Sequence, residues 1–160
     1  MGLRVDTVRT AGGRESTREI VEHEDCVAVI VIDADDNVLL VSQFRKPIEK
    51  ELLEIPAGGI EPGEDPAECV CRELREETGY LPRKVERLSG FYSAPGYCTE
   101  YLHLYLATDL TPSPLQAEDT ESITVVRVPL EQIPGLIASG DICDGKSIAG
   151  LLHFLEYHRR

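Results

Sequence analysis

Apolar and polar positions alternate along the N-terminal part of the chain with the two-residue period of β-strands. Residues 3–10 and 16–23 show this alternation on either side of a Gly-Gly pair, which predicts an antiparallel hairpin with one wet face. Residues 26–32 (CVAVIVI) are continuously apolar, a pattern typical of a strand buried on both faces. Further strands are predicted at residues 38–45, 52–56 (a short extended piece), 84–92, 101–108 and 122–128.

The best-marked helix lies in mid-chain and runs from about Pro66 to about Thr78. Asp65 is a natural N-cap, proline suits the first helical position, and Gly79 can adopt the left-handed conformation that closes a helix. With about 100° of rotation per residue, one side of this helix is apolar. The predicted buried stripe consists of Ala67, Val70, Cys71, Leu74 and Thr78.

Two more helices are predicted near the C-terminus. One spans 129–139 and is bent near Pro134, and the other spans about 146–158. The apolar face of the last helix is predicted to contain Ile148, Leu151, Leu152 and Leu155. Mixed strands with one helix in mid-chain and one at the end favour an α/β sandwich, in which a mixed β-sheet carries helices on both faces. We expect one domain over residues 1–160.

Composition restricts the partners of the protein. The chain has 29 acidic and 16 basic residues and a net charge of −13, which argues against broad contact with nucleic-acid phosphates. No apolar run approaches the ~18 residues of a membrane span, and no leader pattern is present, so a cytoplasmic protein without membrane contact is expected. The 5 cysteines include no CxxC pair and indicate neither a disulfide framework nor a zinc site.

Three carboxylates of the mid-chain helix, Glu73, Glu76 and Glu77, are spaced i, i+3 and i+4 and share one arc. On an open surface each like-charge pair costs about a few tenths of a kcal/mol. In a cleft, two carboxylates about 5 Å apart repel by roughly 3 kcal/mol, and a divalent cation such as Mg²⁺ or Mn²⁺ reverses the sign. The helix alone leaves both interpretations open. Cys69 lies between Glu73 and Glu76 in angle, and we interpret it as a buried filler rather than a thiol ligand.

The spacing of residues around the helix favours the metal-binding interpretation. Gly58 is followed after five residues by Glu64, and after seven more by RELREETG, residues 72–79. This arrangement resembles the Nudix box, with one departure, because the box has an aliphatic residue where this chain has Tyr80. The resemblance implies an α/β/α sandwich and a metal-dependent hydrolase, in which water attacks a phosphorus of a nucleoside diphosphate linked to another group.

The resemblance also implies roles for individual residues. Metal binding is assigned to Glu73, Glu76, Glu77 and the backbone carbonyl of Ala57. Arg72 and Glu64 match positions that brace the loop and the helix, so their loss is expected to act partly through structure. Mg²⁺ is the expected cofactor, with Mn²⁺ as the alternative.

Two features outside the box resemble the ADP-ribose pyrophosphatase branch, namely Pro95, fifteen residues past the box, and the segment 42–58. Pro95 is equally consistent with an ordinary turn. In this branch a late acidic loop activates water, and here Glu121 is the candidate metal ligand or base, with Asp119 as its rival. Taken alone, that loop would be interpreted as a solvated turn.

Substrate contacts are predicted for Arg45, Glu54 and Gly58, in addition to Pro95. The fork of Arg45 suits a diphosphate, although a surface arginine at a strand end is an equal alternative. Glu54 is assigned to the ribose or the loop. Branch members often bind adenine between two subunits through an N-terminal aromatic residue, and this resemblance implies a homodimer through the N-terminal strands, about residues 1–23. This chain has no aromatic residue before Phe44, so the stacking partner is Phe44, a tyrosine such as Tyr97, or nothing aromatic.

The predicted reaction is hydrolysis of ADP-ribose to AMP and ribose 5-phosphate. Within the same family the alternatives are a GDP- or UDP-sugar and an oxidised nucleotide. A non-catalytic Nudix domain that senses a nucleotide is a further alternative, but it predicts a damaged box, and residues 72–79 are intact. A structural protein with an acidic helix leaves the spacing from Gly58 to Glu64 unexplained.

Overall fold

The computed structural model describes residues 1–116 and 123–158. The strands are β1 (Gly2–Arg9), β2 (Glu15–Glu22), β3 (Cys26–Val31), β4 (Asn37–Arg45), β5 (Lys50–Glu54), β6 (Ala57–Gly59), β7 (Tyr80–Tyr92), β8 (Tyr101–Pro112) and β9 (Thr124–Pro129). The helices are α1 (Pro66–Glu77), α2 (Ile133–Ser139) and α3 (Gly145–Tyr157), with the 3₁₀ turns η1 (Lys46–Ile48) and η2 (Leu130–Gln132).

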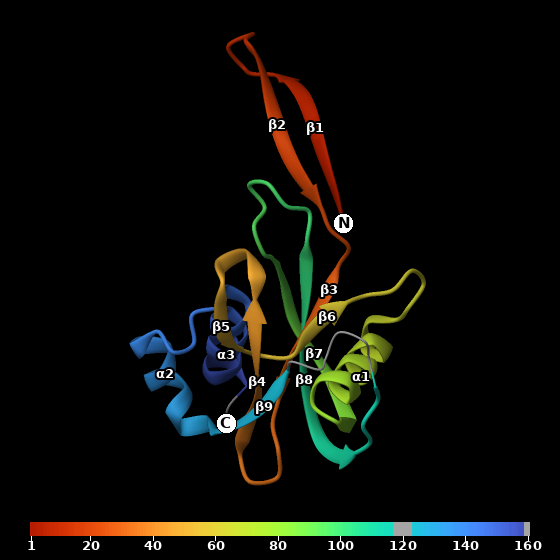
Figure 1. The fold of residues 1–160 in the computed structure, drawn as a ribbon, viewed down its shortest axis with the longest axis vertical. Coiled ribbons are helices and arrows are strands. Elements are labelled where there is room, and N and C mark those ends of the chain that lie inside the picture. Colours follow the sequence, from red (N-terminus) through yellow and green to blue (C-terminus); the bar gives the residue numbers. More distant parts are fainter. Residues whose placement is uncertain (117–122, 159–160) are drawn as a thin grey trace.

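β3 lies at the centre of the molecule, between α1 and α3 (Figure 1). Its alternate residues belong to two apolar clusters, one against each of these helices. The apolar cluster against α1 contains Val27, Val29, Val31, Val70 and Leu74. The cluster against α3 contains Ala28, Ile30, Leu151 and Phe154. Because a strand points successive side chains to opposite faces, an unbroken apolar run is what a strand between two helices requires. The predicted sandwich with helices on both faces, and the burial of residues 26–32, are confirmed.

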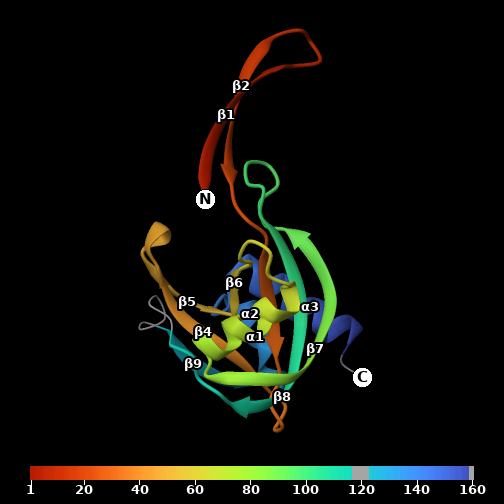
Figure 2. The ribbon, with the colours of Figure 1, turned by 90° about the vertical axis from the view of Figure 1, so that its right-hand side faces the viewer.

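The strands form two sheets and a separate hairpin rather than one sheet. The mixed sheet has the order β6-β3-β8-β7, in which β3 and β8 are parallel and the other neighbours are antiparallel. The second sheet, β5-β4-β9, is antiparallel. Figure 2 shows α1 between the two sheets, and the cluster beneath it takes Leu39 from β4 and Val125 from β9. The helix therefore joins both sheets into one core.

β7 and β8 are longer than the predicted strands 84–92 and 101–108. Their antiparallel ladder begins at Tyr80 opposite Pro112 and ends at Tyr92 opposite Tyr101. Pro82 lies inside β7, which is an edge strand, where the missing N–H of proline is tolerated. The length of the ladder is set by pairing between distant segments, which local patterns do not show.

α1 agrees with its prediction at both ends. The Asp65 side chain accepts a hydrogen bond from Ala67 N at 2.8 Å, and Gly79 has φ of 78°. The predicted buried stripe needs one correction, because Cys69 is fully buried and Cys71 only partly. Cys69 Sγ lies 3.4 Å from the carbonyl oxygen of Gly59, so β6 covers a side of the helix that the sequence left open. The interpretation of Cys69 as a buried filler is confirmed.

α3 begins at an Asp144 cap, whose side chain accepts from Ser147 N at 3.0 Å. Its buried face includes Leu151 and Phe154, whereas Leu152 is 47% exposed, so the predicted face was partly wrong. Gly150 explains the rotation, because a Cβ atom there would lie only 3.0–3.2 Å from core side chains. The helix approaches the sheet through this glycine. The predicted bend near Pro134 corresponds to the passage from η2 into α2.

The predicted N-terminal hairpin, β1 with β2, projects away from the remainder of the molecule (Figures 1 and 2). At its base, Val21 N donates to Tyr97 O at 2.7 Å and Thr99 N donates to Val21 O at 3.0 Å, so the loop 93–100 holds the end of β2. Leu3 and Val5 are exposed on the hairpin. Among the described residues, no helix has both the length and the apolar character needed to cross a membrane.

Candidate active site

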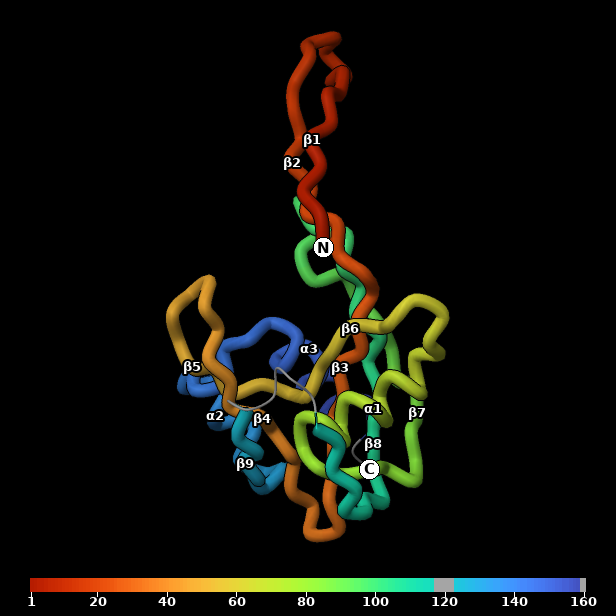
Figure 3. The backbone as a smooth tube through the Cα atoms, turned by 45° about the vertical axis from the view of Figure 1, so that its right-hand side comes forward, coloured from red at the N-terminus to blue at the C-terminus, as the bar shows by residue number. Residues whose placement is uncertain are grey.

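The acidic arc of α1 is enclosed rather than solvated. The exposed fraction of the side chain is 11% for Glu73 and 16% for Glu76, and Glu77 is also partly buried. Figure 3 shows the chain passing from β6 through a loop into α1, so that β6 and the helix lie side by side. The partly buried carboxylates therefore repel one another more strongly than they would in water, and a bound cation would offset this repulsion.

Gly58 lies where the carboxyl group of Glu73 meets β6. A Cβ atom at this position would overlap the Glu73 carboxyl group. A larger residue would displace that side chain, which gives a physical reason for the glycine at the start of the motif. The residue was predicted as a substrate contact, and it does line the neighbouring cavity.

Arg72 ties the loop to the helix. Its Nε and Nη2 donate to Glu64 at 2.8 and 2.9 Å, and Nη2 also donates to the carbonyl oxygen of Gly59 at 2.9 Å. Nη1 donates to Glu73 at 2.6 Å and lies 3.4 Å from Glu76. Hydrogen bonds from Arg72 lower the pKa of Glu64 to about 2. These are the contacts that a brace between loop and helix would make.

Glu77 has a strongly shifted pKa. Burial, together with the negative charge of Glu73, raises the pKa of its carboxyl group to about 8, although a hydrogen bond from Ala57 N opposes the shift. That bond measures 3.2 Å from Ala57 N to Glu77 Oε2. Burial also raises the pKa of Glu73. The Glu77 carboxyl group is thus poised to exchange a proton for a cation.

The donor set matches a hard divalent cation. Glu73, Glu76 and Glu77 supply carboxylate oxygens from one helix, and Ala57 brings its backbone to the same place through its bond with Glu77. Oxygen ligands of this kind suit Mg²⁺ or Mn²⁺ rather than softer metals. The residues present therefore fit the metal that the sequence implied.

A cavity of about 760 Å³ opens beside this cluster, a size within the usual range for a ligand site. Ala57 and Gly58 belong to its lining, which connects it to the α1 carboxylates. Charged residues on its wall include Arg45, Glu54, Asp144 and Lys146. The lining also includes His23, Cys26, Phe91, Tyr92 and Glu100.

Arg45 and Glu54, both predicted to contact substrate, are paired with each other. Arg45 donates to Glu54 through Nε at 2.8 Å and Nη2 at 2.7 Å. Lys146 contacts the same carboxylate and lies 2.9 Å from Asp144. Burial alone would raise the pKa of Glu54, but Arg45 and Lys146 outweigh it and lower that pKa. The Arg45 side chain stays 40% exposed, so it is oriented by Glu54 and open to an anion.

The sequence did not predict a role in the site for Lys146, Phe91 or Tyr92. Lys146 was placed at the start of the last helix without a role, because nothing local shows that this helix end faces β5. Phe91 and Tyr92 line the cavity, whereas neither predicted stacking residue, Phe44 or Tyr97, is part of its described lining.

The other predicted residues lie away from the cavity or outside the described chain. Pro95 is exposed in a turn of the loop 93–100, at the base of the hairpin. Asp119 and Glu121 lie outside the described residues, so their predicted roles stay predictions.

Comparison with known proteins identifies the family. Residues 22–150 match the NUDIX domain. The chain belongs to the Nudix family. The predicted resemblance is confirmed, and the domain covers the cavity wall from His23 to Ala149 as well as the box.

Relatives with high similarity match nearly the whole Nudix chain. It is 38% identical to an ADP-ribose pyrophosphatase of Bacillus subtilis (strain 168), over 91% of this chain and 80% of that protein. It is 40% identical to a methanol dehydrogenase activator of Bacillus methanolicus, over 91% of this chain and 80% of that protein. A crystal structure of an ADP compounds hydrolase superposes with a TM-score of 0.88 at 26% identity and covers 97% of this chain and 85% of that one.

Proposed function

We propose that this Nudix protein hydrolyses the pyrophosphate bond of a nucleoside diphosphate sugar, with ADP-ribose cut to AMP and ribose 5-phosphate. The observation that carries the proposal is the enclosed carboxylate arc of α1 next to a cavity with two cationic side chains, Arg45 and Lys146. Carboxylates that bind metal and cations that bind phosphate are the two parts that phosphoryl transfer to water needs.

Different residues of this chain bind the metal ion, bind the diphosphate and activate the water. When bound to Glu73, Glu76 and Glu77, Mg²⁺ would neutralise the diphosphate and lower the pKa of an attacking water. Glu77, whose pKa is raised, would release its proton when it holds the cation. Arg45, held by Glu54, offers its free edge to a diphosphate oxygen. Glu121 remains our candidate for the base, with Asp119 as the rival.

Support for ADP-ribose comes from the relatives and from the cavity. The Bacillus subtilis relative is named for ADP-ribose and the solved neighbour for ADP compounds. Phe91 and Tyr92 give the cavity an aromatic wall on which a base can stack. The name of the Bacillus methanolicus relative describes an action on a dehydrogenase and adds nothing to the choice of substrate.

A substrate panel tests the reaction. With Mg²⁺ present, the purified protein is expected to release AMP from ADP-ribose at least about tenfold more efficiently than it cleaves a GDP-sugar, a UDP-sugar or an oxidised nucleotide, the size of effect that one selective contact gives. Without divalent ion, turnover should fall to background. The measurement is kcat/KM for each compound by chromatography of products. Preference for another sugar nucleotide would reassign the substrate, and inertness toward all of them would end the proposal.

We also propose a homodimer that forms through the β1–β2 hairpin. Support comes from the projection of this hairpin (Figure 1) and from the exposed side chains of Leu3 and Val5 on it. Light scattering is expected to give twice the mass of the 17.7 kDa chain, and removal of residues 1–22 should give a monomer. A monomer for the complete chain would contradict the proposal.

A further inference from the structure

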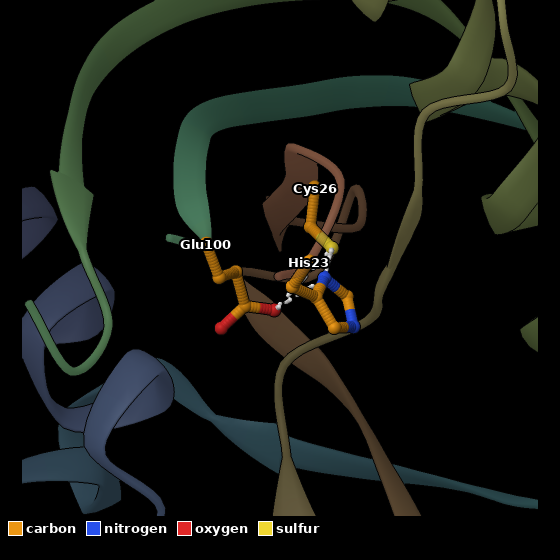
Figure 4. A group of neighbouring side chains, drawn as sticks. All are labelled: His23, Cys26 and Glu100. Carbon is orange, nitrogen blue, oxygen red and sulfur yellow. Dashed lines mark hydrogen bonds and ion pairs between the residues drawn. The ribbon is translucent and has the colours of Figure 1, made fainter. Parts of the chain in front are cut away.

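Three side chains with metal-ligating atoms converge in the cavity wall (Figure 4). His23 follows β2, Cys26 opens β3, and Glu100 directly precedes β8. Cys26 Sγ lies 3.4 Å from Glu100 Oε1 and 3.8 Å from His23 Nδ1, and Nδ1 lies 3.7 Å from that oxygen. The three atoms form a nearly equilateral triangle, to which none of the carboxylates of α1 belongs.

The triangle has the size that a tetrahedral zinc ion imposes on its ligands. Bonds of about 2.3 Å to sulfur and about 2.0–2.1 Å to nitrogen and oxygen place tetrahedral ligand atoms roughly 3.3–3.6 Å apart. The observed separation of 3.4 Å between Sγ and the carboxylate oxygen lies in this range, and those of 3.7 and 3.8 Å require only a small contraction. One thiolate, one imidazole and one carboxylate select a Zn²⁺-type ion over Mg²⁺.

The backbone positions these ligands in advance. The Thr99 hydroxyl accepts from His23 N and donates to His23 O, both at 2.9 Å, which clamps the segment after β2 to the segment before β8. Cys26 is held between β6 and β8 by strand pairing and is 6% exposed. The side chains of His23 and Glu100 are about three-quarters buried. The backbone that carries the three ligands therefore needs little reorganisation to accept an ion.

We propose that His23, Cys26 and Glu100 bind one zinc-type divalent cation, separate from the hard cation of the α1 carboxylates. Three protein ligands leave a fourth position open, and all three residues line the cavity, so that position faces the substrate space. Because β6 pairs Cys26 with Gly59, next to Gly58, an ion bound there competes with the α1 cation for the oxygens of the diphosphate, and hydrolysis is inhibited. This inhibitory effect rests on the proposed function, whereas binding of the ion does not.

Binding exchanges protons in a defined way. Without an ion, burial raises the pKa of the Cys26 thiol to about 12, and Glu100 adds to the shift, so the thiol is protonated. His23 Nδ1 lies 2.8 Å from the carbonyl oxygen of Glu24 and donates to it. On binding, the thiol proton leaves to solvent and the imidazole carries its proton on Nε2, which frees Nδ1 for the ion.

The sequence predicted no zinc site because its cysteines lack the CxxC spacing. Here His23 and Cys26 are separated by two residues, but Glu100 comes from a segment that only the parallel pairing of β3 with β8 brings near. The site is assembled by topology and has no local signature.

Titration with Co²⁺ in excess Mg²⁺ tests the site. We expect one equivalent of Co²⁺ to give a thiolate-to-cobalt charge-transfer band, and Zn²⁺ to remove it. Cys26→Ser should abolish the band, and His23→Asn and Glu100→Gln should each weaken binding at least about tenfold, as for loss of a ligand contact. The matched control is Cys143→Ser, which replaces an exposed cysteine and should keep the band. Circular dichroism checks that each variant is folded.

Two results separate the parts of the proposal. No charge-transfer band in the wild type, or a band that persists in folded Cys26→Ser, overturns the site. If the band behaves as expected but the fractional inhibition of hydrolysis by Zn²⁺ is the same in wild type and Cys26→Ser, the inhibitory role is overturned. Because the band is measured without substrate, a protein inert in the substrate panel would still show whether these three residues bind the ion.

Discussion

Replacing Glu77 with glutamine is expected to abolish hydrolysis and at the same time to stabilise the metal-free protein at pH 8. The loss of activity follows from the removal of one cation ligand, which is worth several kcal/mol of charge stabilisation and thus at least about 10²-fold in kcat. The gain in stability follows from the raised pKa of Glu77, which means that its ionised form is unfavourable in the folded protein.

The sign can be worked out from that pKa. The carboxyl group has a pKa of about 8 in the folded protein against an ordinary value of 4.5, so between these values the folded state holds a proton that the unfolded chain has released. The free energy of unfolding contributed by Glu77 therefore falls as pH rises through this window. Glu77→Gln, which cannot ionise, should exceed the wild type in stability at pH 8, on the order of a few kcal/mol, and match it near pH 4.5.

Chemical denaturation at several pH values, in the presence of a chelator, measures this difference. Adding Mg²⁺ should stabilise the wild type and leave Glu77→Gln largely unchanged, because an ion that binds only the folded state raises its stability. Glu68→Gln is the matched control, since it removes the same charge from the exposed side of the same helix. Equal stability of wild type and Glu77→Gln at pH 8, or normal turnover of the variant, would contradict this account of the site.

The same helix shows how much of the site the sequence contains. Asp65 and Gly79 mark the ends of α1 because capping depends on neighbours in the chain, and the arc of Glu73, Glu76 and Glu77 follows from helix geometry alone. Enclosure of that arc was an inference from motif spacing, and its physical cause appears only in the fold. β6 lies against the helix, and the absence of a side chain at Gly58 makes room for Glu73.

What the sequence could not show is contact between distant segments. Leu152 was predicted to be buried and Phe154 was overlooked, because the rotation of α3 depends on Gly150 packing against Leu104 in another strand. Arg45 and Glu54 were each predicted to contact substrate, but their pairing with each other and the contact of Lys146 with Glu54 were not predicted. Arg45 is nine residues away across the β4–β5 hairpin, whereas Lys146 is 92 residues away and reaches Glu54 only through the placement of α3.

That second cation gives Glu54 a large expected effect on stability. The carboxylate of Glu54 is almost fully buried between Arg45 and Lys146. Glu54→Gln keeps the shape but leaves two guanidinium donors and a buried ammonium without their counterion. Breaking a buried pair by removing one partner typically costs about 3–5 kcal/mol, and we expect about 3 kcal/mol because Arg45 can turn to solvent and Lys146 keeps Asp144.

Urea denaturation at pH 7 measures this cost, with Glu49→Gln as the matched control. Glu49 pairs with Lys46 at 2.6 Å on the surface, and loss of such an exposed pair is worth about 0.5 kcal/mol or less.

Adding Lys146→Met to Glu54→Gln should recover part of the loss of stability, because the unpaired ammonium is then absent. The pKa of Glu54 is lowered in the folded protein, so its contribution to the free energy of unfolding is present at neutral pH and is lost as pH falls through that pKa. The difference in stability between wild type and Glu54→Gln should therefore shrink in acid. Two outcomes would contradict this account: Glu54→Gln as stable as Glu49→Gln, or the double variant less stable than Glu54→Gln alone. Either would mean that the two cations are solvated. Glu54 would then neither hold α3 against β5 nor orient Arg45 toward the cavity.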